Sequence, residues 1–178
     1  MTRNILAFAA SSSRGSINRQ LVTCATGMLD SVEVKLLDLN DFELPLFSED
    51  RETELGQPEL AQNFYQLIGK CDALVISFAE HNGCYSAAYK NLYDWTSRID
   101  PAVYQGKPMI LLATSPGGRG GRSVLDLALT QMPRFGGEVR GSLSLPHFYD
   151  NFDTETGRIT NPEVERDLQD LMRGLFRV

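Results

Sequence analysis

Apolar and polar positions along the chain form two kinds of short pattern. Nearly unbroken apolar runs occur at residues 5–10, 73–76 and 108–114, as expected for strands that are covered on both faces. Residues 32–37 and 139–145 instead alternate between apolar and polar side chains, which is typical of strands with one wetted face. The pattern predicts five strands, with the second and fifth at the edges of a sheet.

Helical patterns fill the stretches between these strands. Apolar residues recur at helical spacing over 17–29, 58–69, 124–132 and 164–175, and residues 79–98 are expected to form a loop that leads into a helix rich in aromatic residues. Strands that alternate with helices indicate a parallel α/β sheet with helices on both faces. The edge positions fit the order 2-1-3-4-5 of a doubly wound sheet. We expect a single domain over residues 1–178.

Two longer segments show neither pattern and are expected to be irregular. Residues 40–57 are acidic, with an apolar anchor at residues 44–47. A second loop, containing Asp150, Asp153 and Gly157, precedes the last helix.

Composition and charge narrow the class of protein. The chain has 178 residues and a formal net charge of -6, which argues against a nucleic-acid or anionic-membrane surface because both need a basic face. No apolar run approaches the roughly 20 residues that span a bilayer. The three cysteines are odd in number and lack metal-ligand spacing, which predicts a cytoplasmic protein without a metal site.

The predicted sheet brings three polar loops to one edge. In the order 2-1-3-4-5 the switch point lies between the first and third strands, and ligands bind beyond the carboxyl ends there. Residues 11–18, 80–84 and 114–121 follow the first, third and fourth strands, so they are expected to converge on one crevice. The serines of the first loop stand where a helix begins, which favours an anion. Ordinary helix capping is the alternative.

Several ligand classes are excluded by missing motifs. The first turn lacks G-x-G-x-x-G, and the chain has no G-x-x-x-x-G-K-[ST], so neither a Rossmann dinucleotide site nor a P-loop is supported. A phosphorylated signalling receiver would need carboxylates at the ends of the first and third strands to bind magnesium, and these strand ends lack them. A hydrolase would need a G-x-S-x-G nucleophile elbow, and the chain has none. A hydroxyl-lined loop for one phosphate and two glycine-containing loops that flank a flat ring match the needs of FMN.

The same residues carry a resemblance to a known family. SSSRGSIN at residues 11–18, EHNG at 80–83 followed by Lys90, Asn91, Asp94 and Trp95, and SPGG at 115–118 resemble the three signatures of the NADPH-dependent FMN reductase family. That family has a flavodoxin-like fold and includes quinone, azo and chromate reductases. The likeness runs over nearly the whole chain.

The resemblance implies a cofactor site, a reaction and an assembly. The site residues that it implies are Ser11, Ser13, Arg14, Ser16, Ile17 and Asn18 at the phosphate, and Glu80, His81, Asn82, Gly83, Ser115, Pro116, Gly117 and Gly118 at the ring. FMN takes a hydride from NADPH or NADH and passes it to a small-molecule electron acceptor. No dedicated catalytic acid or base is implied. The family's usual assembly is a homodimer or a homotetramer.

Departures from the family pattern leave other functions open. Ala79 and His81 replace a proline and a tyrosine, Ala10 replaces a glycine, and Ser86 with Ala87 replaces a Pro-Gly pair. A flavodoxin-like binding module or carrier with weak or no flavin and no NAD(P)H turnover is the alternative. A flavin-free protein that acts through protein contacts is a third reading.

Some side chains near the expected crevice have two readings each. His81 is either a catalyst or a loop residue that bonds the backbone. Cys84 is expected to be a small buried residue rather than a redox thiol. The aromatics Tyr85, Tyr89, Tyr93 and Trp95 either pack inside the protein or cover a substrate or subunit. Arg119 and Arg122 either meet a second phosphate or are solvated charges, the latter being favoured, and His147 is taken as structural.

Overall fold

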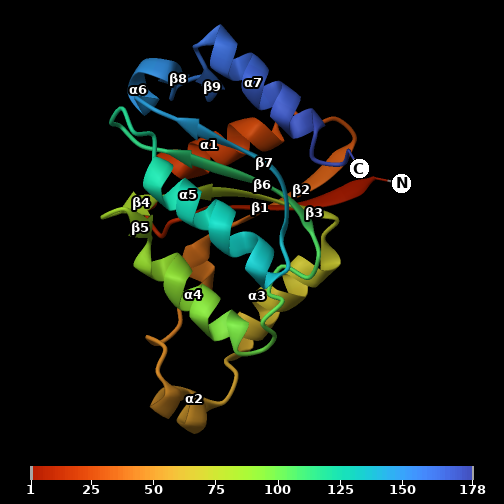
Figure 1. Ribbon diagram of the computed structural model, residues 1–178, viewed down its shortest axis with the longest axis vertical. Coiled ribbons are helices and arrows are strands. Elements are labelled where there is room, and N and C mark those ends of the chain that lie inside the picture. The colour runs from red at the N-terminus through yellow and green to blue at the C-terminus, as the bar shows by residue number, and fades with distance from the viewer. Residues whose placement is uncertain (1, 178) are drawn as a thin grey trace.

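A five-stranded parallel sheet lies at the centre of the computed structural model, which describes residues 2–177 (Figure 1). Its strands are β1 (Arg3–Ala10), β2 (Val32–Leu37), β3 (Ala73–Phe78), β6 (Pro108–Thr114) and β7 (Glu138–Leu145). They pair in the order β2-β1-β3-β6-β7. The predicted doubly wound sheet and its order are confirmed. Met1 and Val178, the ends of the predicted domain, lie outside the described residues.

Burial along the strands follows the hydrophobic pattern. All of β3 is buried, and so are the last six residues of β1 and of β6. Most of β2 and β7 is partly or fully exposed, because each has a strand on only one side. The predicted edge positions of these two strands are therefore correct.

Two helical layers cover the sheet. The helices α1 (Ile17–Thr26) and α7 (Pro162–Arg173) lie on one face, and α3 (Glu59–Lys70), α4 (Ala87–Ser97) and α5 (Arg122–Gln131) lie on the other (Figure 1). Successive side chains of β1 pack on opposite faces of the sheet. Ile5 belongs to the apolar cluster under α1 and α7, and Leu6 belongs to the cluster on the other face. Within residues 2–177, no helix is long and apolar enough to cross a membrane.

The aromatic residues of α4 are core residues. Tyr89 and Trp95 are fully buried, and Tyr93 is nearly so. The hydroxyls of Tyr89 and Tyr104 are hydrogen-bonded to each other in this core. Burial raises the pKa of Tyr89 well above its ordinary value, with the neighbouring Tyr104 adding to the shift. Of the two readings of these aromatics, internal packing is correct.

The segment predicted as irregular over residues 40–57 contains two short helices. These are η1 (Leu39–Phe42) and α2 (Glu49–Leu55). No residue of α2 is buried; instead Ser48 caps its first turn, three acidic side chains lie there, and Gly56 ends it at a positive φ. Caps and charges stabilise this helix, so a hydrophobic pattern does not reveal it.

The predicted apolar anchor of this segment is partly correct. Trp95 Nε1 donates to the carbonyl of Pro45 at 2.7 Å, and the Phe47 ring meets the Trp95 ring edge-on. Leu46, in contrast, is 71% exposed. Residues 45–57, here called the α2 arm, therefore project from the body of the protein and are tied at their base to α4 (Figure 1).

The loop predicted before the last helix is also partly regular. It contains α6 (Phe148–Asn151) and a hairpin of β8 (Phe152–Asp153) and β9 (Arg158–Ile159). The Asp153 carboxylate accepts hydrogen bonds from the Thr156 hydroxyl and from the Glu155 N–H, and Gly157 has a positive φ. These contacts are typical of turns. Strands of two residues are too short to show the alternating hydrophobic pattern from which a strand is predicted.

Candidate functional site

The loops after β1, β3 and β6 converge at the carboxyl edge of the sheet. They border a cavity of about 270 Å³. Its lining comprises Ser11, Ser13, Gly15, Ser16, Ile17, Asn18, Ala79, Glu80, His81, Thr114, Ser115, Pro116 and Tyr149. Nine of the predicted site residues are among them. Arg14, Asn82, Gly83, Gly117 and Gly118 lie on the same three loops outside this lining.

The first loop holds hydroxyl and amide hydrogens that have no acceptor. Ser16 caps α1 by accepting from the Arg19 N–H at 3.3 Å, and the Ser11 hydroxyl accepts from the Ser13 N–H at 3.2 Å. A serine hydroxyl that accepts still has its own hydrogen to donate. Among residues 2–177, the N–H groups of Ile17 and Asn18 have no acceptor either.

Helix α1 presents its positive dipole end to this loop. Its first turn carries no acidic side chain, so nothing there neutralises the partial charge of the free N–H groups. Ser16 is therefore a helix cap that also lines the cavity and retains a hydroxyl hydrogen to donate. The two readings of the serine loop are compatible.

Asn18 connects the first loop to two other strand ends. Its Oδ1 accepts from the Thr114 N–H at 3.0 Å and from the Ser77 hydroxyl at 2.8 Å, while its Nδ2 donates to the Thr114 carbonyl at 3.2 Å. The side chain is buried, and one Nδ2 hydrogen is left over. Asn18 thus ties the start of α1 to the ends of β3 and β6.

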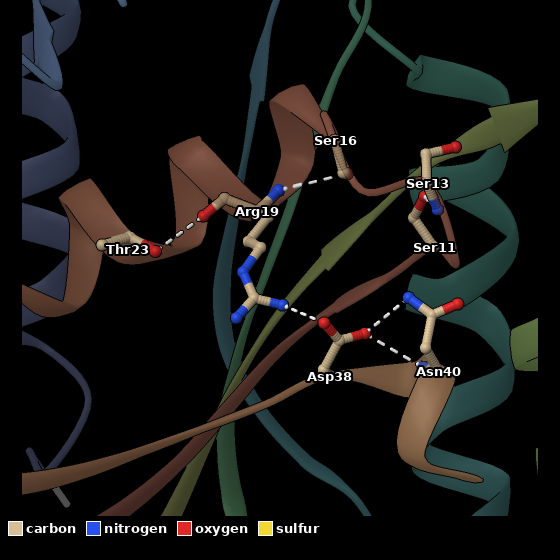
Figure 2. Close-up of polar contacts among 7 residues, drawn as sticks. All are labelled: Ser11, Ser13, Ser16, Arg19, Thr23, Asp38 and Asn40. Carbon is tan, nitrogen blue, oxygen red and sulfur yellow. Dashed lines mark hydrogen bonds and ion pairs between the residues drawn. The ribbon is translucent and has the colours of Figure 1, made fainter.

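An ion pair beside the first loop was not predicted. Arg19 Nη1 lies 2.8 Å from Asp38 Oδ2, just after β2 (Figure 2). The pKa of Asp38 is lowered, chiefly by the hydrogen bond from the Asn40 N–H, and also by the Asn40 amide and by Arg19. Arg14 is exposed and has no side-chain partner within residues 2–177. Of these two arginines, Arg14 is the one without an ion-pair partner in the described part of the chain.

The second loop is a tight hairpin rather than an open loop. It pairs β4 (Glu80–His81) with β5 (Cys84–Tyr85), and the turn residues Asn82 and Gly83 both have positive φ. Asn-Gly is the preferred dipeptide for this turn, so the signal was present in the sequence. Cys84 is exposed, and the expectation that it is buried was wrong.

Glycines of the third loop serve different needs. A Cβ on Gly120 would lie 2.5 Å from Ser144 Oγ, and Gly120 also has a positive φ. A Cβ on Gly117 would meet nothing within 4 Å. Packing against β7 therefore requires Gly120, whereas Gly117 leaves open space at the crevice.

The third-loop arginines make local contacts. Arg119, in the exposed loop before α5, donates from Nη2 to the Ser123 hydroxyl at 2.8 Å, and Arg122 pairs with Asp126 at 3.0 Å on α5. This arrangement fits the favoured reading of solvated charges.

A larger hollow lies elsewhere on the protein. It measures about 660 Å³ and is bordered by α1, α7 and the β8–β9 hairpin. It shares no residue with the predicted site, and its lining mixes two arginines with two glutamates. We do not consider this hollow a candidate site for a charged ligand, because its lining has no convergent set of like charges. Residues 2–177 also contain no group of three His, Cys, Asp or Glu side chains placed to hold a metal.

Comparison with known proteins decides the family. The sequence profile of the NADPH-dependent FMN reductases matches residues 3–149. The chain belongs to this family. An NAD(P)H-dependent FMN reductase of Pseudomonas aeruginosa is 31% identical over 114 residues, which are 64% of this chain and 60% of that protein. An NADPH:quinone oxidoreductase of Arabidopsis thaliana is 32% identical over 58% of this chain and 56% of its own length.

The NADPH-dependent FMN reductase fold is also found in solved structures. FerB, a flavoenzyme NAD(P)H:(acceptor) oxidoreductase of Paracoccus denitrificans, superposes with a TM-score of 0.77 at 22% identity, covering 98% of this chain and 95% of FerB. The family and the flavodoxin-like fold are as predicted. The two sequence relatives match over little more than half of their own lengths.

Proposed function

We propose that this protein is an FMN-dependent NAD(P)H oxidoreductase with a small acceptor, such as a quinone, an azo compound, free flavin or a metal ion. Family membership supports the reaction class. One structural observation carries the cofactor: two hydroxyl hydrogens and two backbone N–H groups without acceptors meet at the start of α1. A terminal phosphate is the ligand that such a set of donors prefers.

The residues present fit FMN. Ser11, Ser13, Ser16 and the N–H groups of Ile17 and Asn18 would bind the phosphate, with Arg14 as the nearby cation. The β4–β5 hairpin and residues 115–118 would border the flavin ring. The open space at Gly117 and the turn at Asn82 and Gly83 would leave backbone groups free to bond the ring edge.

The chemistry requires little from the chain. Bound FMN supplies a hydride acceptor that is then a hydride donor. The protein binds the tail, orients the ring and leaves one side open for the nicotinamide and the acceptor. We propose no side chain as an acid or base; His81 is exposed and has no side-chain hydrogen bond within residues 2–177.

A titration tests the cofactor. Purified protein is mixed with FMN and followed by its visible spectrum and by quenching of flavin fluorescence, and then supplied with NADH or NADPH and a quinone. We expect binding and nicotinamide oxidation. A Ser11→Ala, Ser16→Ala double variant is expected to bind FMN at least tenfold more weakly, since two charge-assisted hydrogen bonds are lost. Thr130→Ala, at the exposed end of α5 and outside the cavity lining, is the control.

The same experiment separates the alternatives. Flavin binding without nicotinamide oxidation would favour a carrier or binding module. Protein that takes up no FMN would contradict the proposal and leave a role through protein contacts.

Three further properties belong to this proposal: a single domain, a location in the cytoplasm and an assembly of subunits. Three free cysteines support the location, because thiols persist in a reducing compartment. A homodimer or homotetramer is supported by Leu46 and Leu55, which are 71% and 51% exposed on the α2 arm. Sedimentation of the purified protein tests the assembly.

A further inference from the structure

A fourth strand-end loop reaches the predicted cofactor cavity. It follows β7 and leads into α6. The His147 N–H donates to the Gly117 carbonyl at 3.0 Å, and the Phe148 N–H donates to the Ser115 carbonyl at 3.1 Å. The His147 imidazole lies against Gly118, where an added Cβ would be 3.0 Å from Nε2. The fourth loop is therefore held against the third loop along its backbone.

Tyr149 lies in α6, at the end of this loop, and lines the cavity. It shares the lining with the first-loop serines. Its ring meets the ring of Phe148 edge-on, with centroids 5.3 Å apart, and Phe148 is fully buried. Tyr149 itself is 65% exposed and is the single aromatic residue in that lining. A buried neighbour thus anchors an exposed ring at the mouth of the cavity.

The lining also shows which part of the cavity Tyr149 faces. Six residues of the first loop, from Ser11 to Asn18, line it, whereas the second and third loops contribute only the residues nearest their strands. The hairpin turn at Asn82 and Gly83 is outside the lining. Tyr149 therefore shares its cavity mainly with the first loop, whose donors lie at the start of α1, and not with the tip of the second loop.

We propose that Tyr149 is a binding residue of the phosphate subsite, an inference that rests on the proposed function. Its ring covers the bound phosphate against water, and its hydroxyl, which can donate, adds a hydrogen bond to those of Ser11 and Ser16. Displacing water strengthens the charge-assisted bonds beneath the ring. The ligand class is a phosphate monoester at the end of a flavin.

Flavins with and without the phosphate test this inference. FMN and riboflavin are titrated into the wild-type protein, Tyr149→Phe and Tyr149→Ala. We expect the dissociation constant for FMN to rise several-fold for Tyr149→Phe and tenfold or more for Tyr149→Ala. The affinity for riboflavin is expected to change less than twofold. Asp150→Ala, an exposed neighbour outside the lining, is the control and is expected to bind both flavins like the wild type.

Inorganic phosphate separates this inference from the proposed function. Its binding is followed by the amide NMR signals of Ile17 and Asn18 in the wild-type protein and both variants. Phosphate binding that weakens in the variants, in a protein that takes up no FMN, would support Tyr149 and contradict the proposed function. Equal FMN binding by all three proteins, or equal losses for riboflavin and FMN, would overturn the role of Tyr149. Failure of the wild type to bind either ligand would overturn both.

Discussion

Glu80 caps a helix that lies 44 residues further along the chain. Its Oε2 accepts a hydrogen bond from the Val124 N–H at 2.9 Å. Helix α5 begins after Gly121, which has no side chain to cap it. A carboxylate at the first turn also interacts favourably with the helix dipole. The contact couples the second loop to the third, so the two walls proposed for the flavin ring are held in a fixed relation.

Removing this cap is expected to destabilise the protein. Glu80→Ala should lower the free energy of unfolding by about 1 kcal/mol, the usual cost of a lost cap. Glu80→Gln retains an acceptor and should lose less. Urea denaturation measures both, with Glu54→Ala, an exposed glutamate of α2, as the control. Unchanged stability in Glu80→Ala would show that the contact contributes nothing.

Two glycines of the third loop should respond differently to the same change. A Cβ on Gly120 would lie 2.7 Å from the Pro146 N as well as close to Ser144, and the φ of Gly120 is +57°. Gly120→Ala is expected to lower stability by about 2 kcal/mol or more through overpacking and backbone strain. Gly117→Ala should change stability by less than about 0.5 kcal/mol, because its site is open. Thermal unfolding compares the pair.

The lowered pKa of Asp38 predicts a small loss of stability in acid. A carboxyl with a depressed folded pKa stabilises the fold above its unfolded pKa of about 4, and this contribution is lost as pH falls through the folded value. Asp38→Asn should therefore flatten the acid side of the stability profile. The main cause is the Asn40 N–H and Arg19 comes later, so Arg19→Gln should retain most of the pH dependence. Urea midpoints between about pH 2.5 and 6 decide this.

Sheet order and loop convergence were predictable from the sequence. Continuous apolar runs can be satisfied only by strands covered on both faces, and the alternating runs at residues 32–37 and 139–145 had to lie at edges. Because the carboxyl ends of parallel strands lie at one edge of the sheet, that order predicts three loops at one crevice. The serine loop is one of them because it directly follows the first strand.

Other parts of the site have no such signal. The Glu80 to Val124 contact and the Arg19 to Asp38 pair join residues that come together only through the fold. Tyr149 follows an edge strand, which the switch-point argument does not assign to the crevice. In the β4–β5 hairpin the strands are two residues long, and only the Asn-Gly turn marks them.

Asn18 gives the sharpest separation between folding and binding. Its amide satisfies the Thr114 backbone and the Ser77 hydroxyl in a buried setting. Asn18→Ala leaves these groups without partners, which should lower the free energy of unfolding by about 2–4 kcal/mol. Asn18→Asp retains both accepted bonds, but it turns a carboxylate oxygen toward the Thr114 carbonyl and buries a charge, so it should be destabilised at least as much.

Binding should separate these two variants by their charge. A carboxylate at residue 18 places negative charge beside the free N–H groups of α1, so Asn18→Asp should bind FMN far more weakly than riboflavin relative to wild type. Asn18→Ala adds no charge and should retain more FMN affinity wherever it remains folded. Calorimetric titration with both flavins, at a temperature where each variant is folded by circular dichroism, measures the difference. Equal losses for FMN and riboflavin in Asn18→Asp would mean that the phosphate does not lie at the start of α1.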